Sequence, residues 1–224
     1  QAIISALAVG SVRAAVPGYE AMAARFTTFG EEMSREAAIA AATKRWGREQ
    51  AAWLDRLARD PEAVGTIAFY TSGWSSQVNP WLRETGEDLG RVAAQTTQQR
   101  ALDRALRSAV AGSDITVFRG FRAGGSLFRR YAAMEPGERF RDFGWVSTSA
   151  VKHLAWSGEV LLEIKIPRGT RGVGWVAPAS AHPQQLEVLI RRAAWMRVLS
   201  RGPAEGALAA RKGWRLHLVV ELLP

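Results

Sequence analysis

The sequence contains no cysteine. Disulfide bonds, zinc–thiolate sites and thiol nucleophiles are therefore excluded, and cysteine usage gives no indication of the compartment. Histidine is scarce too: His153, His182 and His217 lie far apart, without the paired spacing of metal ligands. We therefore expect no zinc or iron site.

Long hydrophobic runs are also missing. The apolar opening AIISALAVGSV covers about eleven residues, which is too short to span a membrane. It lacks a basic leader, so we expect a buried helix there. Because the chain begins with Gln1, we expect it to be an excerpt of a longer protein.

Acidic residues are outnumbered. The chain has 21 Asp and Glu against 30 Lys and Arg, a formal net charge of +9, and only four of the basic residues are Lys. This excess favours an anionic partner, such as nucleic acid, a phosphate-bearing cofactor, a membrane surface or an acidic protein. Arginine suits bidentate phosphate contacts, but an Ala- and Arg-rich chain also follows from genomic base composition alone.

Helical signals fill the first half. Ser34 is placed as the N-cap of a helix through SREAAIAAATKRWGREQAAWLDRLARD, and Asp60 with Pro61 announces the next helix. A third helix is predicted in QQRALDRALRSAV. Apolar residues recur at helical spacing in the first and third segments, at Ile39, Trp46, Trp53 and Leu57, and at Leu102, Leu106 and Val110.

After Gly112 the pattern changes to short β-branched or aromatic runs separated by Gly and Pro. These runs are DITVFRGF, WVSTS, EVLLEIKIP, EVLIRR, WMRVLS and WRLHLVVELL. Helices followed by strands, without regular alternation, indicate an α+β domain. No internal repeat or low-complexity linker divides the chain, so we expect one domain over residues 1–224.

Several catalytic motifs are absent. The sequence has no G-x-S-x-G elbow, no Walker A sequence and no G-x-G-x-x-G after a strand. Nothing local supports a Ser–His–Asp triad, and nothing places Asp142 and Glu187 together as a glycosidase pair.

Polar residues remain at the ends of three predicted strands. Arg119 precedes Gly120, a pairing that lets a guanidinium bind phosphate while bare backbone approaches a ligand. The hydroxyl of Ser147 in STS can hold a carboxylate in one rotamer, and a lone carboxylate such as Glu187 stabilises a developing cation. Together they suit a reaction on a phosphorylated substrate that passes through a cationic centre. Taken singly, each also fits an ordinary salt bridge or polar strand face.

The stretch PQQLEVLI, residues 183–190, sets an amide and a carboxylate two positions apart before an apolar run. If the stretch is a strand, Gln185 and Glu187 share one face and Leu186 points into the core.

In this order, FRG with Arg119, STS with Ser147 and QLE with Glu187 resemble the Arg–Ser–Glu class of mono-ADP-ribosyltransferases. That family includes the Rho-modifying exoenzymes and the catalytic domains of the actin-modifying binary toxins. Upstream, AFYTSGWSSQVNPWLR is similar to the family's helix, with a YT pair and then Asn79-x-x-Leu-Arg83. Downstream, GEVLLEIKIPRGTRGVGWVAPASAHPQQLEVLI resembles its strand, variable loop and catalytic strand. The resemblance covers residues 65–222.

The resemblance implies an α+β fold of two packed, roughly perpendicular β-sheets, antiparallel or mixed, that bind NAD in the cleft between them. Residues 1–64 would be a helical lead packed against a catalytic core at 65–224. NAD would be consumed as a substrate, with no metal.

The resemblance also assigns roles. Arg119 would hold the NAD diphosphate or ribose, Gly120 would offer backbone hydrogen bonds to the nicotinamide carboxamide, and Ser147 would orient Glu187. The Glu187 carboxylate would bind the ribose 2′-hydroxyl and stabilise the oxocarbenium ion that forms as neutral nicotinamide leaves. The full set of expected NAD-binding residues is Arg119, Gly120, Arg83, Asn79, Ser147 and Thr148.

Gln185 departs from relatives that carry Glu at this position. Those relatives generally modify arginine, whereas relatives with Gln modify Asn in proteins or guanine in nucleic acids. An amide cannot act as a base, but it can pair with another amide or a base edge. We therefore predict a non-arginine acceptor, with a protein side chain such as Asn favoured over RNA or DNA.

Other acceptor contacts are expected from the loop before this pair, at His182 and Trp175, where related enzymes often carry an aromatic residue. Basic residues are expected to flank the cleft and would suit nucleic-acid phosphates, an acidic protein or NAD itself. They are Lys165, Arg168, Arg171, Arg191 and Arg192.

Two other functions stay open: an NAD glycohydrolase, in which water captures the cation, and a non-catalytic nucleotide-binding relative. The family resemblance implies a toxin or secreted effector, delivered to act in the cytoplasm of a target cell. A toxin used against competitors would need a cognate immunity protein.

Overall fold

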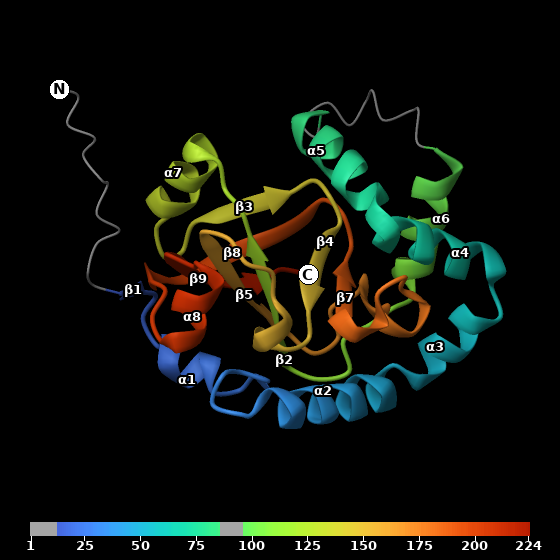
Figure 1. The fold of residues 1–224 in the computed structure, drawn as a ribbon, viewed down its shortest axis with the longest axis horizontal. Coiled ribbons are helices and arrows are strands. Elements are labelled where there is room, and N and C mark those ends of the chain that lie inside the picture. Colours follow the sequence, from blue (N-terminus) through green and yellow to red (C-terminus); the bar gives the residue numbers. More distant parts are fainter. Residues whose placement is uncertain (1–12, 86–95) are drawn as a thin grey trace.

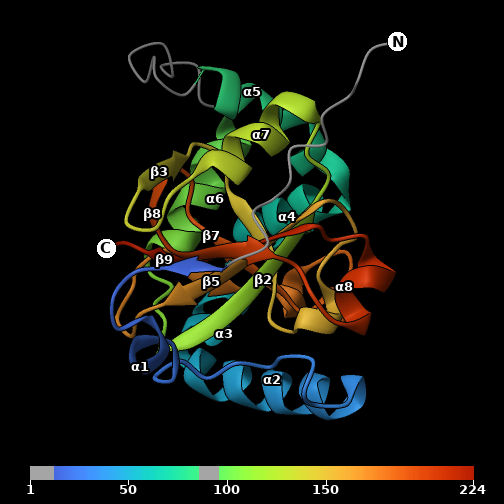
Figure 2. The ribbon, with the colours of Figure 1, turned by 90° about the vertical axis from the view of Figure 1, so that its left-hand side faces the viewer.

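The computed structural model describes residues 13–85 and 96–224 (Figure 1). The predicted opening helix falls on residues 1–12 and lies outside the described residues. Figures 1 and 2 show strands at the centre, α2 running beneath them, and α4, α5 and α6 along one side.

The predicted N-caps of the first two helices are confirmed. Ser34 Oγ accepts a hydrogen bond from Ala37 N at 3.2 Å, and Asp60 Oδ1 accepts one from Ala63 N at 3.0 Å. The first predicted helix is, however, two helices, α2 (Arg35–Glu49) and α3 (Ala51–Ala58). The break lies at Gln50, whose buried amide donates to Val173 O at 2.7 Å and accepts from Trp175 N at 2.7 Å.

The helix with the YT pair is bent. α4 (Pro61–Phe69) runs into a π-helical turn, η1 (Tyr70–Trp74), and then into α5 (Ser75–Thr85). Gly73 sits in this turn with a φ of 137°, a conformation that strongly favours glycine. α6 (Thr97–Arg107) buries Leu102 and Leu106. Val110 does not join their stripe, because the helix ends before it and its side chain is exposed.

In the described part of the chain, nine strands form a mixed network in the order β1-β8-β9-β5-β2-β4-β7-β6, with β3 paired to β8. The β5–β9 pair is parallel and the other pairs are antiparallel. Their bounds are β1 Ala14–Ala15, β2 Ile115–Phe121, β3 Arg139–Asp142, β4 Val146–Ser149, β5 Val160–Ile166, β6 Val173–Trp175, β7 Glu187–Ile190, β8 Ala194–Pro203 and β9 Leu216–Leu222. The shorter helices are α1 Tyr19–Ala23, α7 Gly125–Ala133 and α8 Ala207–Lys212, with 3₁₀ turns η3 Lys152–Leu154, η4 Ala177–Ala179 and η5 Pro183–Gln185.

The predicted α+β class is confirmed. Instead of two separate sheets, the strands form one network in two parts, β4-β7-β6 and the remaining strands. Among the described residues, the paired register between β2 and β4 consists of Phe118 with Ser149 alone. The two parts are therefore joined at a narrow point.

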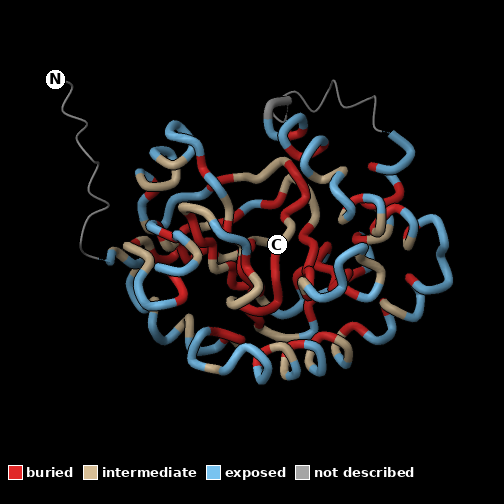
Figure 3. The backbone as a smooth tube through the Cα atoms, in the orientation of Figure 1, coloured by how far each residue is buried: buried red, intermediate tan, exposed pale blue. Residues whose placement is uncertain are grey.

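Burial follows the strands and the inner faces of the helices (Figure 3). The main core holds Ala38, Ala42 and Trp46 of α2 together with strand residues such as Ile164. A second cluster lies between α3, α4 and α6 and includes Trp145, just before β4. No helix of the described residues is long and apolar enough to cross a membrane.

Candidate active site

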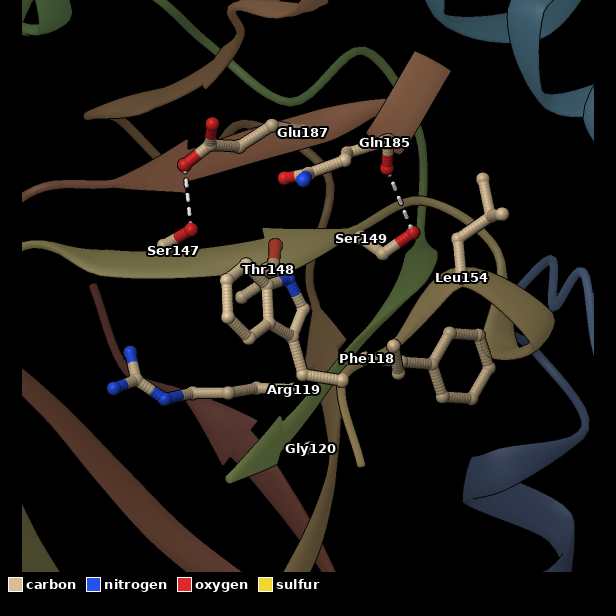
Figure 4. A pocket seen from close by; sticks show the side chains of 11 residues that line it. Phe118, Arg119, Gly120, Ser147, Thr148, Ser149, Leu154, Gln185 and Glu187 are labelled. Atoms are coloured by element: carbon tan, nitrogen blue, oxygen red, sulfur yellow. Dashed lines mark hydrogen bonds between the residues drawn. The ribbon is translucent and has the colours of Figure 1, made fainter. Parts of the chain in front are cut away.

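One pocket gathers Arg119, Ser147, Gln185 and Glu187, the polar residues expected at the ends of the three strands (Figure 4). Its walls come from β2, β4, the junction of η5 with β7, and the end of η3 with the segment after it. The lining residues are Phe118, Arg119, Gly120, Ser147, Thr148, Ser149, Leu154, Ala155, Trp156, Gln185 and Glu187.

Ser147 and Glu187 meet across two neighbouring strands. In the β4–β7 register Ser149 faces Glu187, so Ser147 lies on the same face, two residues along. Ser147 Oγ donates to Glu187 Oε1 at 2.5 Å, and Glu187 is only 5% exposed. Burial raises the pKa of Glu187, while the Ser147 hydrogen bond and the Arg119 charge oppose that rise. Ser147 and Glu187 are thus hydrogen-bonded to each other in the wall of the pocket.

Gln185 is placed by a turn and not by a strand. It ends η5, and β7 begins only at Glu187. Between them Leu186 has φ 48° and ψ 49°, a left-handed conformation, while its side chain is buried as expected. Ser149 Oγ holds the turn by donating to Gln185 O at 3.1 Å. Strand alternation was therefore the wrong reason, although both side chains do line one pocket.

Arg119 and Gly120 belong to β2 and lie across the pocket from Gln185 and Glu187 (Figure 4). The Nη1 atom of Arg119 is buried and has no hydrogen-bond partner among the described residues, so the guanidinium retains a donor for a ligand. A Cβ at Gly120 would lie 1.7 Å from Trp156 O and 2.7 Å from Trp214 Nε1. No side chain fits at that position, because the Trp156 carbonyl and the Trp214 indole already lie against the β2 backbone there.

Arg83 and Asn79 are not in the lining of this pocket. Arg83 binds Asp142 through two contacts, Nε to Oδ1 at 2.9 Å and Nη2 to Oδ2 at 3.2 Å. Burial would lower the pKa of Arg83, but the Asp142 carboxylate outweighs it and raises the pKa. Asn79 is buried, donates to Tyr70 OH at 2.8 Å and accepts from Trp145 N at 3.1 Å. It thus secures the chain that leads into β4.

The remaining expected contacts differ in their placement. Thr148 lines the pocket, but its hydroxyl donates to Val188 O at 2.6 Å. His182 is exposed at the start of η5. Trp175 is 6% exposed in the main core, with its ring against Gly47 of α2, and it does not line the pocket.

The five basic residues expected to flank the cleft do not line the pocket. Lys165 is 3% exposed and pairs with Glu163 at 2.8 Å, and Arg192 pairs with Asp103 at 2.7 Å. Arg191 packs its aliphatic stem near Gly172. Lys165 and Arg192 are therefore engaged in ion pairs within the fold, whereas Arg168 and Arg171 are exposed.

Sequence reasoning missed the wall formed by Leu154, Ala155 and Trp156. Trp156 is 66% exposed, the largest exposure among the large exposed hydrophobic residues described. The signal was present in KHLAWSGE, residues 152–159, where an aromatic residue precedes Ser-Gly in the segment that follows the STS strand.

Comparison with known proteins agrees with this geometry. The family described as ADP-ribosyltransferase exoenzyme matches residues 43–219. Plx2a, an ADP-ribosyltransferase toxin from Paenibacillus larvae, is 25% identical with a TM-score of 0.66, covering 82% of this chain and 95% of that chain. No curated protein sequence matches the chain significantly.

Two further structures share the fold. The C3 exoenzyme of Clostridium limosum has a TM-score of 0.71 at 17% identity, and the match covers 89% of this chain and 98% of that chain. C3stau2 from S. aureus, solved with NAD, has a TM-score of 0.68 at 20% identity, and the match covers 89% of this chain and 99% of that chain.

Among the described residues no cluster of His, Cys, Asp or Glu suits a metal ion. The chain belongs to the ADP-ribosyltransferase exoenzyme family and is an NAD-dependent mono-ADP-ribosyltransferase of the toxin type, with NAD as its substrate.

Proposed function

We propose that this enzyme transfers ADP-ribose from NAD to an acceptor other than arginine, and that the acceptor is an amide side chain such as Asn in a protein. The observation that carries the proposal is the pairing of Gln185 with Glu187 in one pocket, so that the pocket holds an amide where an arginine-directed enzyme would hold a second carboxylate.

The proposed roles in NAD binding are those that the family resemblance implies, and the contacts of each residue qualify them. Arg119 would bind the diphosphate or ribose, because its Nη1 is buried without a partner among the described residues. Gly120 would offer its backbone to the nicotinamide carboxamide. Arg83 would act from outside the pocket, with Asp142 fixing its orientation and Asn79 supporting the same region. Thr148 would contribute mainly through its position in β4, since its hydroxyl already donates to the backbone.

In the proposed reaction the glycosidic bond between ribose C1′ and nicotinamide nitrogen breaks, and the bonding electrons leave with nicotinamide. The ribose becomes an oxocarbenium ion, which the Glu187 carboxylate stabilises more than it stabilises bound NAD. A nitrogen of the acceptor then bonds to C1′ and loses a proton to solvent. No metal or general acid is required, because nicotinamide leaves as a neutral molecule.

Gln185 would then select the acceptor. Its side chain is half-buried at the pocket, and the end of η5 and the Ser149 hydrogen bond fix its backbone. An amide can donate to and accept from another amide at once, but it cannot take a proton from a guanidinium. His182, exposed three residues earlier, would contribute to the same acceptor surface.

The test uses labelled NAD and a cell lysate, followed by protease or nuclease. We expect label that protease removes and nuclease spares. The reverse would favour nucleic acid, the main alternative, and free ADP-ribose alone would favour an NAD glycohydrolase. Absence of any turnover would favour a non-catalytic nucleotide-binding relative. The Glu187→Gln variant is the control for label that does not depend on catalysis.

We further propose that the enzyme is a delivered effector that acts in the cytoplasm of a target cell and that a cognate immunity protein protects the producer. The support is the toxin description of the similar structure from P. larvae. Expression inside a bacterial or eukaryotic cell should be toxic with Glu187 and harmless with Glu187→Gln.

We also propose that the helical lead expected over residues 1–64 folds, in its described part, as one domain with the described residues of the catalytic core at 65–224. Ala38, Ala42 and Trp46 support this, because they lie in the same core cluster as the strands.

A further inference from the structure

The pocket wall at residues 155–158 is held from outside the pocket. Ala155 and Trp156 line the pocket, but the groups that bind their backbone come from the far end of the sequence. Lys212 Nζ, in the last turn of α8, donates to Ala155 O at 2.7 Å. Trp214 Nε1, just before β9, donates to Trp156 O at 2.9 Å.

Backbone contacts complete the attachment. Gly158 N donates to Lys212 O at 3.0 Å, so the wall and the end of α8 bind each other in both directions. Three residues before this wall, Lys152 N donates to Phe29 O at 3.1 Å. Residues 152–158 are therefore hydrogen-bonded to the rest of the protein at both ends, with the exposed Trp156 side chain between these bonds.

The hydrogen bond from Trp214 Nε1 to Trp156 O lies next to Gly120. Trp156 O occupies the space where a Cβ of Gly120 would stand, and Trp214 Nε1 is the next nearest atom. Trp214 is 3% exposed in a small cluster with Phe118 and Ala155, both of which line the pocket. The indole N–H thus fixes a carbonyl that lies in contact with β2 at the pocket.

Neither Lys212 nor Trp214 lines the pocket. We infer that the two side chains are positioning residues for the known reaction: they hold the 155–158 wall against Gly120 and thereby set the affinity for the part of NAD that lies there. The inference rests on the proposed binding of NAD in this pocket. Burial lowers the pKa of Lys212, with a smaller effect of Arg211.

A positioning role of this kind predicts a split between KM and kcat. The wall contacts NAD in the ground state and in the transition state alike, whereas the charge that stabilises the cation sits across the pocket on Glu187. Weakening the wall should therefore raise the KM for NAD and leave kcat nearly unchanged. Loss of one buried hydrogen bond of this class should change KM by about tenfold.

The experiment measures NAD turnover and the melting temperature of four variants. Trp214→Phe removes the indole donor, Lys212→Met removes the ammonium, and Lys212→Arg restores a donor. Trp195→Phe, at a 45% exposed residue of β8 outside the pocket, is the matched control for Trp214. We expect KM to rise about tenfold in Trp214→Phe and Lys212→Met, with kcat within about twofold. Lys212→Arg and Trp195→Phe should keep the original KM.

Direct binding separates this inference from the proposed function. NAD affinity is measured by calorimetry with Glu187→Gln alone and combined with Trp214→Phe or Lys212→Met. Failure of both the unaltered enzyme and the single variant to bind NAD would reject the site itself. Binding that Trp214→Phe and Lys212→Met leave unchanged, or a fall in kcat with KM constant, would reject the positioning role only. If Trp214→Phe does not fold, the Lys212→Met and Lys212→Arg pair decides.

Discussion

Ser147 Oγ lies 2.5 Å from Glu187 Oε1, across the β4–β7 pair. The hydroxyl holds a carboxylate that is 5% exposed and whose pKa is raised by burial. The site therefore keeps an anion in poor solvation beside the place where a cation is proposed to form. The attraction between this carboxylate and the ribose becomes stronger as positive charge develops on the ribose, and this stabilises the transition state more than bound substrate.

Glu187→Gln should reduce kcat by about 100-fold or more, because the amide cannot stabilise the oxocarbenium ion. The same change should raise the melting temperature at neutral pH. A carboxyl whose pKa is raised by folding contributes stability only at low pH, and that contribution is lost as the pH rises through the folded pKa. Turnover assays and thermal unfolding at pH 7 check both parts. A variant that loses activity and stability together would show that Glu187 holds the fold.

The pH dependence of kcat should report Glu187. The carboxylate must be ionised to act, so activity should fall as the pH decreases through a pKa above the ordinary 4.5. Ser147→Ala removes a hydrogen bond that lowers this pKa and should move the acid limb to higher pH. Thr148→Val is the neighbouring control, because its hydroxyl binds Val188 O and not Glu187. An acid limb at the same pH in wild type and Ser147→Ala would contradict this assignment.

Gln185→Glu should create labelling of arginine. A second carboxylate at this position would attract and deprotonate a guanidinium, which the amide cannot do. Label on arginine-rich test peptides, checked for the chemical stability of the arginine linkage, measures the change. The exposed neighbour Gln184 provides the matched control, Gln184→Glu. Strong arginine labelling by the unaltered protein would overturn the proposed acceptor.

Gly120→Ala should weaken NAD binding by about tenfold or more, because the new Cβ would lie 1.7 Å from Trp156 O and must displace the backbone there. Gly65→Ala, with open space around the position in α4, is the control and should retain full affinity. Calorimetry with NAD and thermal unfolding of both variants measure the difference. Equal affinities would show that the backbone at Gly120 does not contact NAD.

Glu163→Gln should destabilise the fold by about 3 kcal/mol at neutral pH, because it leaves the buried Lys165 ammonium without its partner. Burial would raise the pKa of Glu163, but His217 and Lys165 outweigh it and lower the pKa to about 2. The contribution is therefore present above the ordinary value of 4.5 and is lost as the pH falls toward 2.

Urea unfolding across this pH range tests the Glu163 prediction. The difference between wild type and variant should shrink on acidification. Glu62→Gln, in a pair whose two side chains are both 55% exposed, should cost under about 1 kcal/mol. A difference that does not depend on pH would contradict the ion pairing.

The α+β class and the helix starts were predictable because they depend on local chemistry. Ser34 and Asp60 cap their helices through their own side chains, and neither cap requires a distant partner. The strand cores followed from β-branched runs in the same way. The break between α2 and α3 at Gln50 could not be predicted in this way. It depends on hydrogen bonds from Gln50 to β6, which is distant in the sequence.

Site residues on paired strands could be predicted from the sequence, whereas residues whose surroundings depend on tertiary packing could not. Ser147 and Glu187 meet because their strands pair, and the order of motifs indicated as much. Trp175 is an aromatic residue of the kind that contacts ligands, but it packs against α2. Lys165 pairs with the carboxylate of Glu163 within the fold. Gln185 lines the predicted pocket because Leu186 adopts a left-handed backbone conformation, and the sequence alone does not predict that conformation.

The narrow junction between β2 and β4 has a consequence for how the enzyme works. Arg119 lies on one side of the Phe118–Ser149 pair, and Ser147 and Glu187 lie on the other. A ligand that contacts Arg119 and Glu187 at the same time would connect the two parts of the sheet across this junction. ADP-ribose keeps both contact points after the glycosidic bond breaks, so that connection would persist until the ADP-ribosyl group leaves the pocket.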